Sequence, residues 1–303
     1  MAVDRGRYGC VLPGDAGARE ITAMKARELG RRSVVVGDTA SLAGDVSGAP
    51  GTLARIVRVA PRVSVLRRSA DDSDPVERVI VANADQLGIV CALASPPPRP
   101  RLIDRFLVAA YDAGLEPLLL LTKADLASPD DLLATYAPLG VRHLVTARPL
   151  TEMVLDRLRA LLAGQVSVLV GHSGVGKSTL VNALIPEAGR TVGSVSPVTG
   201  RGRHTSSSAV ALNLPGGGWI IDTPGLRSFG LAHIAVNRVV RAFPDLADGV
   251  AGCPPGCTHL TAECALDAWV SAHDGEGGHA GALAARLDSL RRLLRSRESD
   301  DSR

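Results

Sequence analysis

Hydrophobic residues follow two different patterns along this chain of 303 residues. In its first quarter, short runs rich in Val, Ile and Leu are separated by Gly, Pro and Asp, which is typical of short strands joined by turns. Five such runs occur: RGRYGCVL, REITAMKA, SVVVGDTASL, LARIVRVA and VSVLRR. Five short strands in so small a segment fit a compact barrel, and we expect an OB-like barrel over residues 1–75.

From residue 76 onward, apolar runs of strand length alternate with amphipathic segments. The runs RVIVANADQLGIV and PLLLL lie on either side of IDRFLVAAYDAG, whose apolar spacing predicts a helix. Such alternation is typical of helices packed on a mostly parallel sheet. We therefore expect an α/β domain over residues 76–230 and a helical domain over residues 231–303.

The composition is that of a folded chain with more than one core. Hydrophobic residues make up 46% and aromatic residues only 3%, so Val, Leu, Ala and Ile must form most of the interior. No apolar run reaches the 18 residues of a transmembrane helix, and MAVDRGRYGC lacks the apolar segment of a signal peptide. We expect a cytoplasmic monomer that does not enter a membrane.

Charge is distributed unevenly, although the net charge is only +3. Residues 1–70 contain 12 basic and 6 acidic residues, so the rest of the chain sums to −3. This asymmetry indicates that the N-terminal part meets a polyanion. A solvated arginine-rich surface explains the same balance equally well, and both readings stay open.

The most specific motif is a phosphate-binding loop, or P-loop. VSVLV predicts a buried strand, GHSGVGKS matches G-x-x-x-x-G-K-[ST], and TLVNALI predicts the helix that follows. In this loop, glycines let backbone N–H groups surround phosphate oxygens at a helix N-terminus, Lys177 reaches the β- and γ-phosphates, and Ser178 binds Mg²⁺. The predicted nucleotide-binding residues are Gly171, His172, Ser173, Gly174, Val175, Gly176, Lys177, Ser178 and Thr179.

A guanine-reading sequence precedes this P-loop. Downstream of residue 185 no [NT]-K-x-D occurs, but TKAD ends the strand PLLLL upstream, with Thr122, Lys123, Ala124 and Asp125. Asp125 would accept from the N1–H and N2–H₂ donors of guanine, which adenine lacks, while the Lys123 stem covers the base. A second strand, HLVTA, ends in Thr146-Ala147, where GTPases brace the base from the other side.

The remaining parts of a GTPase site follow the P-loop. WIIDTPG places Asp222 at a strand end, where it can hold Mg²⁺ through water, and Gly225 can offer its N–H to the γ-phosphate. Between the P-loop and WIIDTPG, the segment GRGRHTSSS provides Thr205 as a further Mg²⁺ ligand. Ordinary GTPases begin at the P-loop and end with the base reader. We therefore predict a circularly permuted GTPase domain.

A cysteine cluster near the C-terminus predicts a metal site. CPPGCTHLTAEC supplies Cys253, Cys257, His259 and Cys264 at the spacing C-x₃-C-x-H-x₄-C. Three thiolates and one imidazole suit a closed tetrahedral Zn²⁺ site, which can stabilise a small domain that has little core. We expect one structural zinc ion, and a redox or catalytic role is the alternative. A disulfide fits neither the compartment nor the histidine within the cluster.

Together these motifs resemble the bacterial GTPase family that depends on the small ribosomal subunit, known as RsgA or YjeQ. VVVGD and RIVRVAPRVSVLRR resemble its OB domain, and GHSGVGKSTLVNAL, GRGRHTSSS and DTPGLRSFGL resemble its P-loop and two switches. The resemblance implies a GTPase that binds the 30S subunit and 16S rRNA, acts late in subunit maturation, and is stimulated by the subunit as it converts GTP to GDP. It also implies that His204 positions the attacking water, with an rRNA phosphate contact as the alternative role.

The chain departs from the family pattern at three places. Thr122 stands where Asn is common, HTSSS stands where HTTT is usual, and the spacings within the cysteine cluster are about one residue shorter. Serine keeps the hydroxyl group, so we expect altered affinity and retained function.

Two alternative functions remain open at this point, and so does the role of one arginine-rich segment. An ATP-using kinase or ATPase would share the P-loop, but Asp125 would then lack a donor to meet on adenine. An RNA-binding scaffold with incidental hydrolysis is the other rival. Arginines of the amphipathic segment RLDSLRRLLRSR are either a solvated face or an RNA contact.

Overall fold

The computed structural model describes most of the chain in nine stretches, which are residues 2–4, 6–13, 18–30, 34–68, 78–189, 209–223, 231, 234–274 and 281–298. Its strands are β1 (Ala2–Asp4), β2 (Arg7–Leu12), β3 (Arg19–Lys25), β4 (Ala40–Gly44), β5 (Ala54–Val59), β6 (Val65–Arg68), β7 (Arg78–Ala82), β8 (Gln86–Ala92), β9 (Glu116–Thr122), β10 (Arg142–Val145), β11 (Val166–Val170), β12 (Val210–Asn213) and β13 (Trp219–Asp222). Its α-helices are α1 (Pro100–Ala113), α2 (Asp130–Tyr136), α3 (Glu152–Leu162), α4 (Lys177–Leu184), α5 (Val236–Val240), α6 (Ala247–Ala251), α7 (Ala265–His273) and α8 (Ala282–Glu298). Among the described residues, none of these helices is both long and apolar enough to span a membrane.

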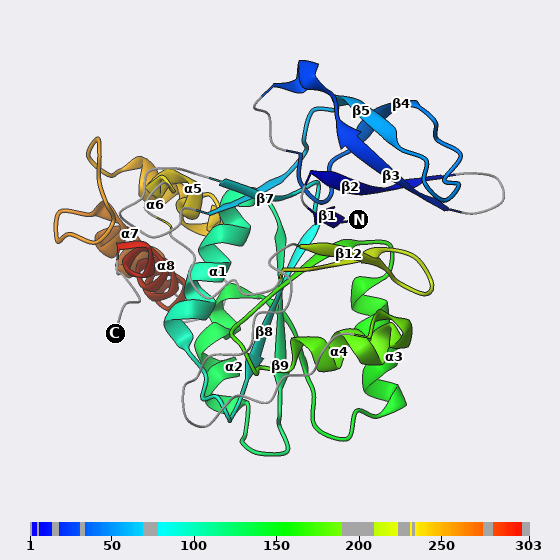
Figure 1. The fold of residues 1–303 in the computed structure, drawn as a ribbon. Coiled ribbons are helices and arrows are strands. Elements are labelled where there is room, and N and C mark those ends of the chain that lie inside the picture. The colour runs from blue at the N-terminus through cyan, green and yellow to red at the C-terminus, as the bar shows by residue number, and fades with distance from the viewer. Residues whose placement is uncertain are drawn as a thin grey trace, which may run out of the picture.

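The N-terminal strands form an OB-like unit, in the upper part of Figure 1. Their order is β1-β2-β3-β5-β4, antiparallel except for the parallel pair β3 and β5. Alternate residues of β3 and β5 face inward, as period-2 patterning requires, and form a small core of their own. That core contains Ile21, Ala23, Leu29, Val34, Ala54 and Ile56.

The segments that form the strands of this unit differ from the sequence prediction at three places. VSVLRR supplies β6, which pairs with β7 in a separate two-stranded sheet and buries Leu66 in the core of the α/β domain. In SVVVGDTASL only β4 is a strand; Val36 forms an isolated bridge, because the chain turns at Gly37 (φ +91°), where a Cβ would lie 1.9 Å from the carbonyl oxygen of Ala82. The short strand β1, which was not predicted, pairs with both β2 and β12.

The α/β domain is a layered sheet with helices on both faces (Figure 1). Its strands lie in the order β10-β9-β8-β11-β13-β12, parallel except for β12. All seven residues of β8 are buried, as expected of a central strand covered on both sides. Residues of α1, α2 and α8 pack into the core on one face, and residues of α3 and α4 into the core on the other.

The order of these strands in the chain places the predicted base reader beside the P-loop. The strand before the P-loop, β11, lies between β8 and β13, although β8, β9 and β10 all precede it in sequence. Five neighbouring strands of this sheet are parallel, namely β10, β9, β8, β11 and β13. Their carboxyl ends therefore meet at one edge of the sheet, where open α/β sheets bind their ligands. The predicted permuted arrangement is confirmed.

The C-terminal helices pack against the α/β domain through α8. In this contact Arg292 lies 3.1 Å from the buried Asp104 of α1 and over the ring of Tyr136 at 4.9 Å. Arg105 donates to the carbonyl oxygen of Ser296 at 3.0 Å. Burial raises the pKa of Asp104, and the nearby charge of Arg292 opposes this rise, so the ion pair is what makes the buried carboxylate tolerable.

Candidate functional site

The P-loop has the backbone conformation that the motif predicts. Gly171 follows β11 with φ +146°, and a Cβ there would lie 2.3 Å from the carbonyl oxygen of Val90. Gly174 and Gly176 have φ of +78° and +103°, which side chains rarely allow. Helix α4 begins directly after the loop, so its unpaired N–H groups form an anion-binding end.

Lys177 points back into this loop. Its Nζ donates to the carbonyl oxygens of Gly171 at 2.5 Å and His172 at 3.2 Å. Burial lowers the pKa of Lys177, and the charge of Asp222 at the end of β13 partly restores it. A partly buried ammonium that donates to carbonyl oxygens is stabilised further by an anion, and a phosphate group would serve.

The predicted base reader is hydrogen-bonded to the same loop. Thr122, at the end of β9, donates from Oγ1 to the carbonyl oxygen of Val175 at 2.5 Å. Lys123, with φ +64°, donates from Nζ to the carbonyl oxygens of Gly174, at 2.9 Å, and Ser95. Burial and the charge of Arg148 lower the pKa of Lys123, and Asp125 opposes them. Two segments distant in sequence are therefore one hydrogen-bonded structure.

The carboxylate predicted to read the base lies beside the second strand end. Ala124 donates from its backbone N–H to Thr146 O at 3.0 Å, and Thr146 N–H donates to Leu121 O at 2.7 Å. These bonds hold the TKAD turn against the turn that contains Ala147. Asp125 is exposed, as a group that must meet a ligand should be.

One residue of this region is not among the site residues predicted from the sequence. Arg148 follows Thr146-Ala147; its backbone N–H donates to Asp125 Oδ1 at 2.9 Å, and its Nη2 donates to Thr179 Oγ1 at 3.0 Å. It thus contacts both the turn that is predicted to read the base and the start of α4. Its position next to the predicted base brace was the one signal in the sequence.

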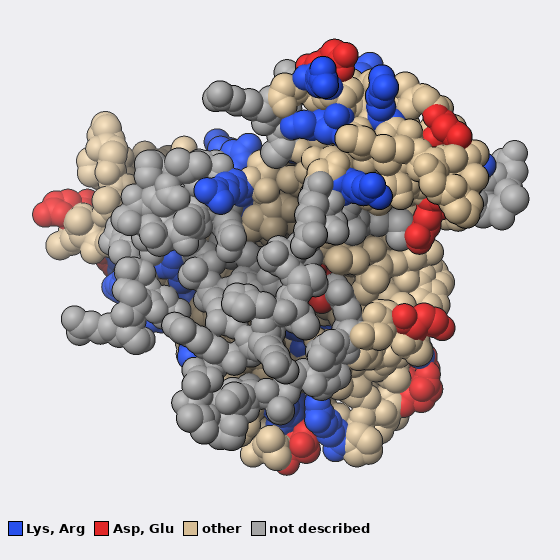
Figure 2. Space-filling view, viewed as in Figure 1, with Lys and Arg blue, Asp and Glu red and all other residues tan. Residues whose placement is uncertain are grey.

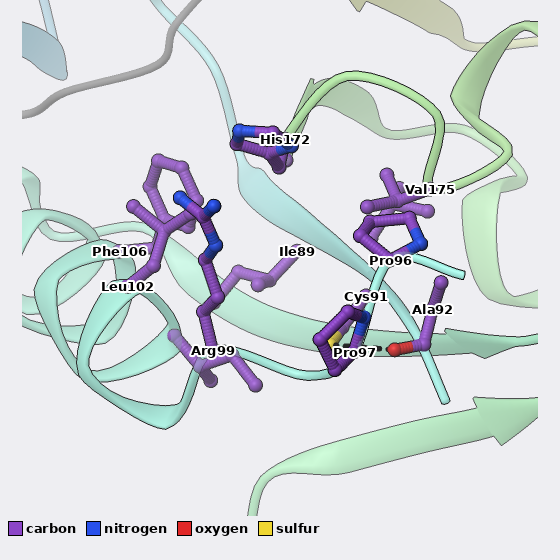
Figure 3. Close-up of a pocket in the computed structure, with 13 residues that line it drawn as sticks. Ile89, Cys91, Ala92, Pro96, Pro97, Arg99, Leu102, Phe106, His172 and Val175 are labelled. Carbon is purple, nitrogen blue, oxygen red and sulfur yellow. Dashed lines mark hydrogen bonds between the residues drawn. The ribbon is translucent and has the colours of Figure 1, made fainter. Parts of the chain in front are cut away.

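An apolar pocket lies behind the P-loop, between β8, α1 and the chain that joins them (Figure 3). The side chain of His172 lines it, with Nδ1 3.0 Å from Ser173 O. The predicted contribution of His172 to nucleotide binding stays a prediction.

Several predicted residues lie outside the described part of the chain. These are His204, Thr205 and Gly225. Asp222 is described and is 8% exposed at the end of β13, and Thr223 Oγ1 donates to Leu169 O at 2.9 Å, which ties this strand end to β11.

The four predicted metal ligands form a single cluster. The ligand atoms of Cys253, Cys257, His259 and Cys264 all lie within 4.8 Å of one another. Cys253 Sγ is 3.8 Å from Cys264 Sγ, and His259 Nδ1 is 3.6 Å from both. Tetrahedral ligands around zinc, with bonds of about 2.0–2.3 Å, lie about 3.5–3.8 Å apart. The donor set therefore fits a zinc ion, and so do the distances among the ligand atoms of Cys253, His259 and Cys264.

The surroundings of His259 favour the neutral imidazole that a metal needs. Burial, and then the charge of Arg291, lower the pKa of His259. Its φ of +61° turns the chain so that its N–H donates to Cys257 Sγ at 3.3 Å. Arg291 of α8 donates from Nε to His259 O at 3.0 Å and pairs with Asp267 at 2.6 Å, which connects the cluster to α8.

Comparison with known proteins gives a consistent result. The family model described as RsgA GTPase matches residues 59–232. The chain belongs to the RsgA GTPase family. A relative named small ribosomal subunit biogenesis GTPase RsgA, from Pseudomonas aeruginosa, is 43% identical over 222 residues, covering 68% of this chain and 64% of its own. The protein of the same name from Ectopseudomonas mendocina is 40% identical over 261 residues, covering 81% and 71%.

Two solved structures have the same fold. YjeQ from Thermotoga maritima matches with a TM-score of 0.67 and 24% identity, covering 96% of this chain and 95% of its own. YloQ, described as a circularly permuted GTPase, matches with a TM-score of 0.65 and 21% identity, covering 97% and 91%. The predicted RsgA-type fold is thereby confirmed. The match to the Pseudomonas aeruginosa relative nevertheless spans just under two thirds of that protein's length.

Proposed function

We propose that this chain is a GTPase that binds the small ribosomal subunit and assists its late maturation. One observation carries the nucleotide part of the proposal: Thr122 and Lys123 hydrogen-bond to the P-loop carbonyls of Val175 and Gly174. These bonds hold the turn that carries Asp125 against the loop that precedes Lys177. A carboxylate for the guanine edge and a cradle for phosphates, joined in this way, suit one guanosine phosphate.

The residues divide the work along the nucleotide. Asp125 accepts from the guanine edge, and Thr146 and Ala147 brace the base from the other side. Residues 171–179 surround the phosphates, with Lys177 at the β- and γ-phosphates. Ser178 and Asp222, at the start of α4 and the end of β13, would hold Mg²⁺, which neutralises charge on the phosphates.

Hydrolysis itself needs a positioned water molecule. Water attacks the γ-phosphorus, the bond to the β-γ bridging oxygen breaks, and GDP and phosphate leave. We assign the positioning of that water to His204 and further magnesium and γ-phosphate contacts to Thr205 and Gly225, from the family pattern GRHT and DTPG. Leu226 follows DTPG, where many GTPases carry the glutamine that orients water, so another side chain must take that role.

The proposed partner is the 30S subunit with its 16S rRNA. Lys and Arg side chains gather over the N-terminal strands in Figure 2, and Arg7, Arg19, Arg55 and Arg58 are exposed there. A polyanion such as rRNA would meet this surface through phosphate contacts. The same proposal includes a monomer, a cytoplasmic location, and three units over residues 1–75, 76–230 and 231–303.

The proposed metal at the cysteine cluster is one structural zinc ion. Three thiols and an imidazole are the donors that zinc prefers, and these four residues would supply one ligand atom each to a tetrahedral site. Bound there, zinc would stabilise the fold and leave no open position for catalysis.

GTP turnover with and without purified 30S subunits tests the function. We expect slow turnover alone and much faster turnover with subunits, and Lys177→Ala should abolish both. Equal turnover of ATP would favour a kinase or ATPase. Normal subunit binding and release by Lys177→Ala would favour an RNA-binding scaffold.

A further inference from the structure

Arg148 contacts residues at both ends of the proposed nucleotide site. Its loop follows β10, and its side chain is exposed. The backbone N–H donates to Asp125 Oδ1 at 2.9 Å, and Nη2 donates to Thr179 Oγ1 at 3.0 Å. The main chain of Arg148 therefore touches the base reader, and its guanidinium touches the helix that follows the P-loop.

Geometry limits what a bound nucleotide can place near this guanidinium. If the base meets Asp125 and the terminal phosphates meet Lys177, the ribose and the α-phosphate must cross the space between them. Thr179 is the third residue of α4, within the first turn, where backbone N–H groups lack intrahelical partners and attract anions. The guanidinium thus lies where the α-phosphate of a bound nucleotide would pass.

Arg148 is also equipped to bind an anion. Within the described part of the chain, its guanidinium takes part in no ion pair, and the recorded partner of its side chain is the neutral hydroxyl of Thr179. A guanidinium carries five N–H donors in a planar fork that matches two phosphate oxygens. Four of those donors are not used in the bond to Thr179.

Neighbouring charge strengthens this assignment. The positive charge of Arg148 helps to lower the pKa of Lys123, so the two cations lie close enough to repel. Asp125 is the acid that opposes this effect at Lys123. Two cations beside one carboxylate leave a local excess of positive charge, which a phosphate would neutralise.

We propose that the Arg148 guanidinium binds the α-phosphate of the guanine nucleotide, exchanging its contact with Thr179 for phosphate oxygens. This inference rests on the proposed GTPase function. GDP and GTP share the α-phosphate, so Arg148 contributes equally to the binding of both. Binding that is equal for substrate and transition state affects KM and leaves kcat unchanged.

The test compares Arg148→Ala and Arg148→Lys with the parent in titrations of GTP, GDP and guanosine, with guanosine measured by competition. In Arg148→Ala the loss of a charge-assisted contact should weaken the binding of GTP and of GDP by the same factor, about 10- to 100-fold. Arg148→Lys should recover part of that loss, and guanosine, which has no phosphate, should bind as it does to the parent. Preference for guanine over adenine should persist, because the backbone N–H that holds Asp125 remains.

Arg142→Ala is the matched control. Arg142 is the first residue of β10, the strand that precedes Arg148, and it contacts Glu116 and Gln86 away from the site. Its nucleotide affinities should equal those of the parent. A parent chain that binds neither GTP nor GDP would defeat the proposed function itself. Parent-like affinities in Arg148→Ala overturn the inference alone, and an equal loss for guanosine assigns Arg148 to the base and overturns the phosphate contact.

Discussion

Thr122 is one of the positions at which this chain departs from the family pattern, and its hydroxyl makes a hydrogen bond that a single substitution removes. Thr122 is 5% exposed, and its Oγ1 donates at 2.5 Å to the carbonyl oxygen of Val175, which is 4% exposed. Thr122→Val keeps the shape of the side chain and removes the donor. The carbonyl of Val175 then loses its side-chain partner in a buried place.

The size of the effect follows from that unsatisfied carbonyl. A buried polar group left without its partner costs about 1–3 kcal/mol, so the free energy of unfolding should fall by about this amount. Because the same bond holds the P-loop to the base reader, GTP and GDP should also bind more weakly, and by the same factor. Lys123 still donates to Gly174 O, which keeps the loop from detaching.

Urea unfolding without nucleotide gives the first quantity, and calorimetric titration with GTP and GDP gives the second. Thr122→Ser keeps the hydroxyl and should stay close to the parent in both. Thr122→Asn restores the common family residue and should retain nucleotide binding. Parent-like stability and affinity in Thr122→Val would show that the hydrogen bond does not hold the loop, and the reasoning would fail.

Three further predictions concern the metal, an ion pair and catalysis. Chelation of the metal, or Cys257→Ser, should lower the thermal stability of the C-terminal helices, as followed by circular dichroism; an unchanged melting curve would argue against a structural ion. Arg292→Met should lower the free energy of urea unfolding by about 3 kcal/mol at pH 8 and by less at pH 5, because burial raises the pKa of Asp104 and its unpaired carboxylate becomes costlier as pH rises. An equal loss at both pH values would contradict this. His204→Ala should reduce subunit-stimulated turnover at least about tenfold with near-normal GTP affinity; a collapse of subunit binding would make His204 a docking residue.

The P-loop, the TKAD turn and the cysteine cluster could be predicted because each is local in sequence. Gly171 and Gly176 are required by backbone conformations that a motif of eight residues specifies, and the four residues of the cysteine cluster lie within twelve residues. The parallel sheet followed from alternating apolar runs. Its permuted strand order followed from the order of these motifs, since each GTPase motif stands at a known strand end.

Contacts between distant segments could not be predicted in the same way. Nothing in VSVLRR indicates that Leu66 packs with the α/β core, because an apolar side chain fits either core equally well. The strand Ala2–Asp4 is too short for a periodic pattern, and it exists through pairing with β2 and β12. The bond from Arg148 to Thr179 likewise depends on how two loops meet. The nucleotide contacts themselves stay predictions.

The central claim is that Asp125, which precedes the P-loop in the chain, reads the base of the nucleotide whose phosphates the P-loop holds. The most direct measurement is the ratio of the Kd values for GTP and xanthosine triphosphate in the parent and in Asp125→Asn. The 2-oxo group of xanthine accepts a hydrogen bond where guanine donates one, so the new amide should reverse the preference. We predict that the parent selects GTP and that Asp125→Asn selects xanthosine triphosphate. An unchanged preference for GTP in Asp125→Asn would contradict the account.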